Sequence, residues 1–231
     1  AQRHAIGLAD LRAQVNLPRQ TLHRTLLQLE ELGLITRDPV RDKFYVGPRL
    51  SSLATGALFS ENHNMPARAI LQRLVDEIGE SCNIGVLDGM SFLYLDRIQT
   101  DKALRIHLEV GARVPAYCTS GGKLLLACLP EADSCALIRS ATLKAHTDRT
   151  ITDVKALEAE LQQCRERGYS TNDGEYTPGI VGVAAPITDK TGRTIAAVAC
   201  HGPSVRVSLD ELKQFIPRLR MAAKELGEYW A

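Results

Sequence analysis

The region from residue 8 to residue 46 constrains the fold most, because helix, break and strand signals follow one another in it at short intervals. Apolar residues recur with helical spacing in two segments, which Asn16-Leu17-Pro18 separates. Two short strand patterns come next. The predicted elements are the helices Leu8–Val15 and Arg19–Leu32 and the strands Leu34–Thr36 and Lys43–Val46. Together they form the outline of a winged helix-turn-helix, a module that lays its second helix in the major groove of DNA.

The second of these helices separates an apolar face from a face rich in hydrogen-bond donors. The predicted buried stripe contains Leu22, Leu26 and Leu29, widened by Leu27 and Leu32. Glu30 and Glu31 fall at the C-terminal end, where they would lie away from phosphates if the N-terminal half entered DNA. We therefore predict DNA contacts by the polar residues Arg19, Gln20, Thr21, His23 and Arg24. The alternative is an ordinary solvated helix face.

The hairpin that follows carries basic residues at its tip. The strand Lys43–Val46 alternates polar and apolar residues, which is typical of a half-buried strand. Arg41 and Lys43 are predicted to contact DNA phosphates, which position a protein rather than specify a sequence. Asp38 and Asp42 keep a second interpretation open, in which this is a plain charged hairpin tip.

The composition neither demands nor excludes this interpretation. A net charge of +1 over 231 residues does not indicate nucleic-acid binding, although a small DNA-binding module attached to a larger neutral domain would give this value. No apolar run approaches the roughly 20 residues of a membrane span, and no signal segment begins the chain. The six cysteines form no C-x-x-C pair. Free thiols in a reducing cytoplasm are the expected state.

The rest of the chain predicts a connector and a second domain of the α+β class. The predicted domains are residues 1–47 (winged helix-turn-helix), 48–64 (connector helix and linker) and 65–231 (second domain). Its helices are expected at 66–78, 119–128, 131–139, 153–167 and 208–229, and its strands at 82–87, 92–98, 104–110, 169–173, 182–188 and 194–201, with a loop at 111–115. Antiparallel strands in adjacent hairpins with flanking helices are typical of an α+β sensor domain.

The sequence Ser120-Gly121-Gly122-Lys123 resembles a phosphate-binding loop only at first sight. That loop requires a glycine five positions before the Gly-Lys pair and Ser or Thr after it, whereas Tyr117 and Leu124 stand there. Small residues at a helix start can still favour a bound anion, because its first N–H groups lack partners inside the helix. Tight packing of the helix against the sheet explains the same glycines equally well.

Two further groups of residues could carry chemistry. Asp173 and Glu175 flank a glycine, but acid–base catalysis would also require a nucleophile or a metal, and neither pattern accompanies them. Cys200 and His201 are neighbours on a predicted strand, so they point to opposite faces and do not easily share a metal. His201 may be read either as a pocket residue or as a core or surface histidine. We expect no catalytic residues, no metal and no cofactor.

In this order and spacing, several short motifs make the chain resemble the IclR family of bacterial transcription regulators. They are Leu17–Arg24, Leu29–Gly33, Tyr45–Leu50, Gly111–Pro115, Gly122–Ala127, Thr150–Thr152, Arg167–Tyr169, Glu175 with Gly179, Ala184–Ile187, and Gly202-Pro203. The resemblance implies a winged helix-turn-helix plus a GAF-like effector-binding domain. It also implies a homodimer or homotetramer, double-stranded operator DNA as partner, and a first helix before Gly7 that is absent or truncated here.

The resemblance further implies that a small organic, possibly aromatic, acid switches operator affinity. The effector positions of the family correspond here to Ser120, Gly121, Asp173, Gly182, Ala199 and His201. Members that bind small keto acids carry hydroxyls where this chain has Ala199 and His201, and a thiol where it has Gly182, which favours a different effector. We expect a carboxylate, with His201 as its partner and the amides of Ser120–Gly122 as the anion site.

Two other functions stay open at this point. The chain could be an enzyme with a DNA-docking module, although it shows no nucleophile–base or metal set. It could also be a DNA-binding protein whose second domain only oligomerises.

Overall fold

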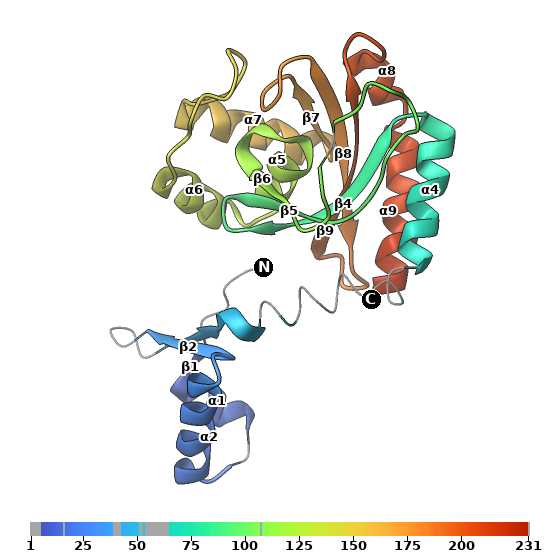
Figure 1. The fold of residues 1–231 in the computed structure, drawn as a ribbon. Helices are drawn as coiled ribbons and strands as arrows, with labels where there is room; N and C mark the ends of the chain where they lie inside the picture. The colour runs from blue at the N-terminus through green and yellow to red at the C-terminus, as the bar shows by residue number, and fades with distance from the viewer. Residues whose placement is uncertain are drawn as a thin grey trace. The chain divides into compact units, whose positions relative to one another are not determined.

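The computed structural model describes residues 6–15, 17–38, 43–50, 53, 65–106 and 108–230. Its contacts divide the chain into two compact units, Ala1–His63 and Asn64–Ala231 (Figure 1). The connector helix predicted at 49–59 lies mostly outside the described residues, although 48–50 are helical. No helix in the described ranges is long and apolar enough to span a bilayer.

The N-terminal unit packs two helices with a three-stranded antiparallel sheet. Its elements are β1 Ile6–Gly7, α1 Leu8–Gln14, α2 Arg19–Glu31, β2 Ile35–Asp38 and β3 Lys43–Val46, and the strand order is β1-β3-β2. Gly33, with φ +67°, follows α2 and stops it, because a side chain is strained in this left-handed conformation. The strand β1 was not predicted.

The core of this unit is small. It consists of Leu22, Leu26 and Phe44, with Leu8, Leu11 and Ile35 partly buried against them. Leu27 and Leu32, which the sequence assigned to the buried stripe, are 44% and 49% exposed. That assignment is wrong because only one narrow face of α2 meets the small sheet and α1.

The C-terminal unit is built on a six-stranded antiparallel sheet in the order β6-β5-β4-β9-β8-β7. The strands are β4 Ser81–Asp88, β5 Ser91–Ile98, β6 Arg113–Pro115, β7 Ser170–Asp173, β8 Ile180–Thr188 and β9 Thr194–Pro203. The helices are α4 Met65–Ile78, the short 3₁₀ helix η1 Ala116–Cys118, α5 Ser120–Ala127, α6 Glu131–Ser140, α7 Val154–Arg167, α8 Leu209–Gln214 and α9 Ile216–Trp230.

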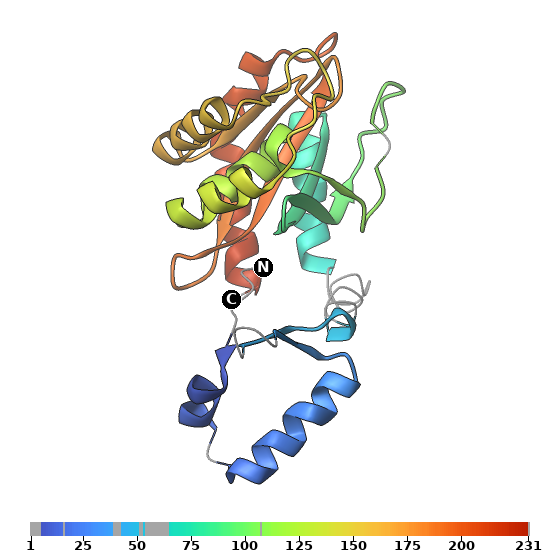
Figure 2. The ribbon, with the colours of Figure 1, turned by 90° about the vertical axis from the view of Figure 1, so that its left-hand side faces the viewer.

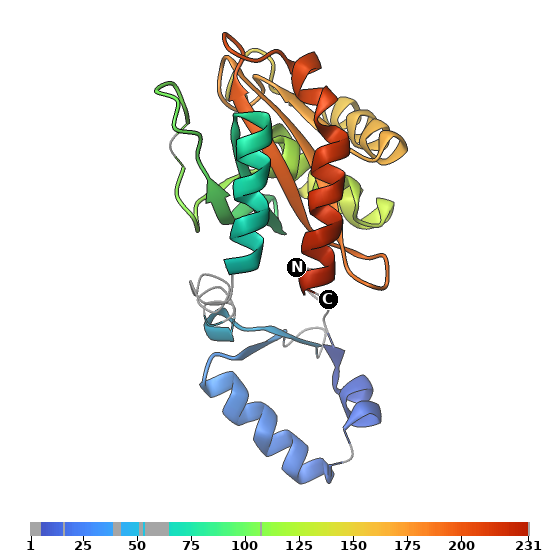
Figure 3. The ribbon, with the colours of Figure 1, turned by 90° about the vertical axis from the view of Figure 1, so that its right-hand side faces the viewer.

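Helices cover both faces of this sheet. Figure 2 and Figure 3 show α4 and α9 side by side on one face and α5 on the other. One apolar core lies on each face, and β9 contributes to both through the alternation of its side chains. Ala196, Val198 and Cys200 belong to the core with α4 and α9, whereas Ala197 and Ala199 belong to the core with α5.

Two predicted elements differ from the structure. The described residues of 104–110 form no strand, whereas 113–115, predicted as loop, form β6. The carbonyls of Leu104 and Ile106 accept hydrogen bonds from arginine side chains instead of a neighbouring strand. The closing helix is divided into α8 and α9 at Phe215, because Pro217 has no N–H and interrupts the helical hydrogen bonds. Ser208 and Glu211 form a capping box at the start of α8.

Candidate nucleic-acid interface and candidate ligand site

The exposed face of α2 carries the residues that the sequence analysis selected for DNA contacts. Arg19, Gln20, Thr21, His23 and Arg24 are all exposed, and so is Lys43 at the start of β3. Arg41 lies outside the described residues. Among the residues that the structure describes, neither Arg19 nor Arg24 is held in a salt bridge, so both guanidinium groups are available to phosphates or base edges.

On the α5 face of the large sheet, three strands bring Asn83, Arg97 and His201 together. Arg97 Nη2 lies 3.0 Å from His201 Nε2, and the amide of Asn83 lies 3.2 Å from His201 Nδ1. Arg97 Nη2 also donates to the carbonyl of Ile106, at 2.6 Å. Asn83 and Arg97 are only 2% and 5% exposed. This cluster, named here the Arg97 cluster, is therefore a polar group inside an otherwise apolar interior.

The imidazole of His201 is neutral. Desolvation of the ring, together with the nearby positive charge of Arg97, lowers the pKa of His201 to about 3. A guanidinium group can only donate, so Nε2 must accept from Arg97 and the single ring proton lies on Nδ1. Among the described residues, Asn83 is the recorded side-chain partner of Nδ1, so its amide oxygen is the acceptor for that proton. The hydrogen-bond pattern thus places the oxygen of this amide toward His201 and its nitrogen away from it.

Polar atoms of the Arg97 cluster remain without partners. Nε and Nη1 of Arg97 are buried with no hydrogen-bond partner in the described part of the chain, and so is the Asn83 amide atom that points away from His201, which is placed as Oδ1 with Nδ2 facing the ring. With the amide oriented as the neutral imidazole requires, this atom is the NH₂ group. All of the unpartnered groups are then donors, so the missing partner is an acceptor.

Arg97 is also a buried positive charge that forms no salt bridge with any described carboxylate. The neighbouring Asp96 accepts the backbone N–H of Arg97 at 2.7 Å, but its carboxylate forms its salt bridge with Arg68 of α4 at 3.0 Å. Burial lowers the pKa of Arg97. A buried charge is costly unless an opposite charge or several hydrogen bonds compensate it, and an anion would supply both.

Four of the predicted effector positions adjoin the Arg97 cluster. A Cβ atom on Gly182 would lie 3.2 Å from Ser120 Oγ and 3.3 Å from the Cβ of His201, so these three residues are neighbours. Ala199 pairs directly with Asn83 across β4 and β9. The structure therefore brings Ser120, Gly182, Ala199 and His201 together around one place.

The other three predicted positions have different surroundings. A Cβ on Gly122 would lie 2.3 Å from the carbonyl oxygen of Ala116, and one on Gly121 would lie 2.6 Å from the ring of Phe92. Close packing, the alternative interpretation, thus accounts for both glycines. The carboxylate of Asp173 is 54% exposed and pairs with Arg149 at 2.6 Å, so the structure does not bring it to His201.

Of the two carboxylates Asp173 and Glu175, Glu175 is the buried one. Its Oε1 accepts from Lys123 Nζ at 2.6 Å, and Lys123 also contacts Glu160 at 3.3 Å. Burial raises the pKa of Glu175, while for Glu160 the charges of Lys123 and Arg167 outweigh burial and lower the pKa. These ion pairs join α5, α7 and the loop after β7, which is a structural role.

Sequence reasoning missed Asn83 and Arg97. Both stand in strands that are apolar at most positions, and the same pairing register places them opposite each other on β4 and β5. A buried asparagine and a buried arginine in predicted core strands were the available signal, because such residues need partners.

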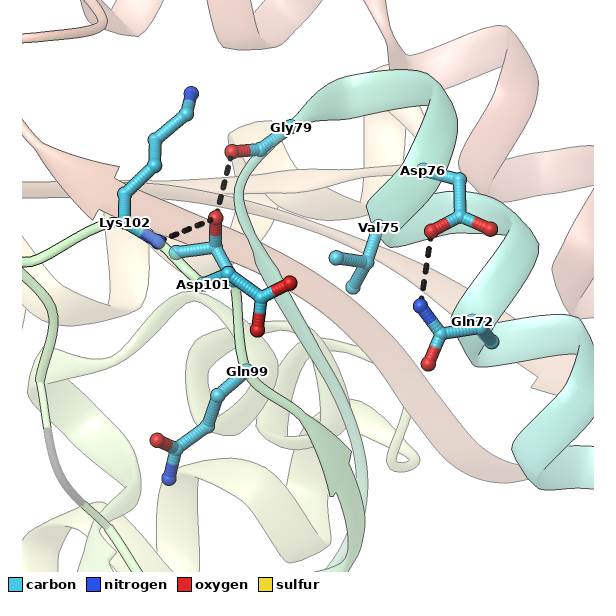
Figure 4. A pocket seen from close by; sticks show the side chains of 8 residues that line it. Gln72, Val75, Asp76, Gly79, Gln99, Asp101 and Lys102 are labelled. Carbon is cyan, nitrogen blue, oxygen red and sulfur yellow. Dashed lines mark hydrogen bonds between the residues drawn. The ribbon is translucent and has the colours of Figure 1, made fainter.

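A second recess lies at the end of α4 and beside the segment that follows β5 (Figure 4). It has a volume of about 500 Å³ and is lined by Gln72, Val75, Asp76, Gly79, Gln99, Thr100, Asp101 and Lys102. Its two carboxylates would repel an anion, and the one amine, on Lys102, is engaged with Glu80 at 3.2 Å. The Arg97 cluster is therefore the better place for an acidic ligand.

Known proteins with similar sequences cover nearly the whole chain. The family described as "Bacterial transcriptional regulator IclR C-terminal" matches residues 57–228. The probable transcriptional regulator SauR of Cupriavidus necator is 42% identical over 221 residues, which cover 96% of this chain and 88% of that protein.

Solved structures of transcriptional regulators are also similar to this chain. A transcriptional regulator of Rhodococcus sp. RHA1 superposes with a TM-score of 0.71 at 32% identity, over 97% of this chain and 89% of that one. The inducer-binding domain of the transcription factor PobR from Acinetobacter, a double mutant in complex with 3-hydroxybenzoic acid, has a TM-score of 0.66 at 30% identity. That likeness covers 70% of this chain and 95% of the PobR domain.

Proposed function

Since this chain belongs to the IclR family of bacterial transcriptional regulators, we propose that it binds operator DNA and that a small organic acid changes its operator affinity. Residues 1–47 are the winged helix-turn-helix in this proposal, residues 48–64 the connector, and residues 65–231 a GAF-like effector-binding domain. The active form is a homodimer or homotetramer.

One observation carries the effector part of the proposal. Strands that are apolar along most of their length bring Asn83 and Arg97, both more than nine-tenths buried, against His201, whose neighbour across the sheet, Gly182, adjoins Ser120. Buried polar side chains with open donors are a cost to folding unless a ligand occupies them. The relative PobR is named as a factor with an inducer-binding domain and was solved with a hydroxybenzoic acid, which supports an acid as effector.

The DNA-binding part rests on α2. Its donors, Arg19, Gln20, Thr21, His23 and Arg24, are exposed on the helix, and the core side of the helix is held by Leu22 and Leu26. The strands β2 and β3 are the wing, with Lys43 and Arg41 directed to phosphates in this proposal. A helix that presents donors from its N-terminal half suits the major groove.

A regulator fits these residues better than an enzyme. Relatives over almost the full chain are named transcriptional regulators or repressors. In the Arg97 cluster the imidazole, whose pKa lies near 3, is a poor general base near neutral pH, because it holds protons too weakly.

The test is DNA affinity with and without acids. Fluorescence anisotropy with a duplex from the promoter region next to the gene would give Kd alone and with each member of a panel of small aliphatic and aromatic carboxylates. We expect at least one acid to change Kd by about 5–150-fold, the usual range of allosteric coupling. A panel in which several acids bind the protein and none changes Kd would contradict the switch, because a ligand shifts an equilibrium only by preferring one state.

A further inference from the structure

The guanidinium of Arg97 has more donors than its surroundings use. Its Nη2 donates to Ile106 and to His201, while Nε and Nη1 have no partner within the described ranges. Asn83 adds an NH₂ group without a partner, once its oxygen faces the Nδ1–H of His201. Three separate buried nitrogen atoms thus have hydrogens that no described residue accepts.

The charges around Arg97 are not balanced by the protein either. The nearest acid along the chain, Asp96, is committed to Arg68, and the buried acids Glu80 and Glu175 are committed to Arg206 and Lys123. His201 carries no charge that could balance Arg97, since its pKa lies near 3. Arg97, which is 5% exposed, therefore retains a positive charge that no described acid balances.

The residues around these donors are small. Ala199 precedes His201 by two residues on β9, and Gly182 stands opposite His201 on β8, where a Cβ atom would lie only 3.2 Å from Ser120 Oγ and 3.3 Å from the Cβ of His201. Ser120 contributes a hydroxyl from the first turn of α5, whose N-terminus favours negative charge. Unpartnered donors, a positive charge and small side chains therefore occur at the same place.

We propose that Arg97 and the amide of Asn83 form an oxyanion-binding subsite, which holds the acidic group of the effector, while His201 positions both residues as a neutral spacer. This inference rests on the proposed function for its biological meaning, but the subsite itself is defined by Arg97, Asn83 and His201. Its ligand class is a small molecule with one terminal oxyanion group.

The role of His201 follows from its two hydrogen bonds. By accepting at Nε2 it fixes one edge of the Arg97 guanidinium, and by donating at Nδ1 it turns the NH₂ group of Asn83 away from itself. Both effects leave N–H groups of Arg97 and Asn83 free of the ring. His201 is therefore a positioning residue and not the anion's own ionic partner.

The experiment measures the thermal midpoint of the full chain at constant ionic strength with matched small probes. Acetate, methanesulfonate and methylphosphonate differ in the oxyanion, and acetamide is the uncharged counterpart of acetate. At tenfold the Kd, a bound anion should raise Tm by about 3–6 °C. Comparison of the three anions identifies the preferred oxyanion group, and acetamide should leave Tm unchanged.

Two variants decide whether Arg97 is responsible. Arg97→Met removes the charge and all donors, so we expect it to lose the anion response while its Tm without anion is equal to or above that of the native chain, because an uncompensated buried charge is gone. Arg68→Met is the matched control, since Arg68 lies 57% exposed and pairs with Asp96 on the other face of the sheet. It should keep the full response.

Three results would overturn the proposal. These are an equal rise of Tm with acetamide, a response that persists in Arg97→Met, or a low Tm of Arg97→Met together with a native chain that ignores all three anions. The last result would make Arg97 purely structural. If the anions bind through Arg97 but operator affinity does not change, the subsite stands and the proposed switch fails. If operator affinity responds to acids equally in Arg97→Met, the switch stands and the subsite fails.

Discussion

In the candidate ligand site, Arg97 supplies the positive charge and the uncharged His201 holds its neighbours in position. The sequence analysis expected His201 to be the ionic partner of a carboxylate. Desolvation and Arg97 instead lower the pKa of His201 to about 3, so the positive charge at this place belongs to Arg97. The distinction arises because an imidazole can give up its charge on burial, whereas a guanidinium keeps its proton.

The neutral His201 predicts a specific loss of stability in mild acid. In the unfolded chain the imidazole of His201 binds a proton below about pH 6.5. In the folded chain it binds one only below about pH 3. The contribution of neutral His201 to the free energy of unfolding is therefore fully present above pH 6.5. It is lost as the pH falls, by up to about 1.4 kcal/mol per pH unit.

The variant His201→Gln isolates this contribution, because a glutamine can accept from Arg97 without a titrating group. Urea unfolding of both proteins from pH 7 to pH 4.5 should show a shallower decline for the variant. The comparison also cancels the opposite contributions of Glu175 and Asp96, whose pKa values burial raises. Parallel curves for the two proteins would mean that His201 is protonated in the folded state.

Among the elements, α2 and α5 carry the two proposed activities in different ways. The helix α2 offers an exposed row of donors, and Leu22 and Leu26 hold it against the small sheet. The helix α5 is buried along its whole length, so it can affect a ligand only through its first turn. An exposed helix can therefore contact a macromolecule, whereas a buried helix start can contact only a small molecule enclosed with it.

On the exposed face of α2, base contacts and phosphate contacts should respond differently to mutation. Arg24→Ala or Arg19→Ala should weaken operator binding by about 1–3 kcal/mol if the side chain reads a base, with loss of sequence preference. A phosphate contact would instead weaken binding to all sequences and reduce the salt dependence by about one unit of slope. Anisotropy titrations at several salt concentrations distinguish the two.

Arg193→Ala is the control for the charge itself. Arg193 is 69% exposed in the C-terminal unit, where it pairs with Asp189. It removes the same charge from the chain but from the other unit, and should leave operator affinity unchanged. Normal affinity in both α2 variants would remove α2 from the DNA interface.

At the scale of the whole molecule, the two units differ in how much apolar core each possesses. The C-terminal unit has one core on each face of its six-stranded sheet. The core of the N-terminal unit is Leu22, Leu26 and Phe44 with three partly buried neighbours. Small cores give little free energy of folding, so the units should differ in stability.

Residues 64–231 alone should therefore fold cooperatively. We expect one calorimetric transition for this fragment and the same rise of Tm with anions as in the full chain, because the Arg97 cluster lies within the fragment. A fragment without a cooperative transition would show that the C-terminal unit depends on residues 1–63. A folded fragment without the anion response would place the response elsewhere.

Much of the element order could be predicted from local signals. The Asp88-Gly89 turn, the capping box of Ser208 and Gly33 after α2 are short-range features, and the structure contains all three. The strand expected at 104–110 failed because an alternating pattern does not reveal whether a neighbouring strand is available. There the carbonyls of Leu104 and Ile106 bind Arg206 and Arg97 instead.

By itself the sequence determined the family, the order of most elements and the exposed donor face of α2, because these depend on residues close together in the chain. Only the tertiary structure decided the ligand site. Asn83 and Arg97 lie 118 and 104 residues from His201, and the strand register alone places all three on one face of the sheet. The same register buries Arg97 without a counter-ion, and burial is what turns an ordinary arginine into a candidate anion site.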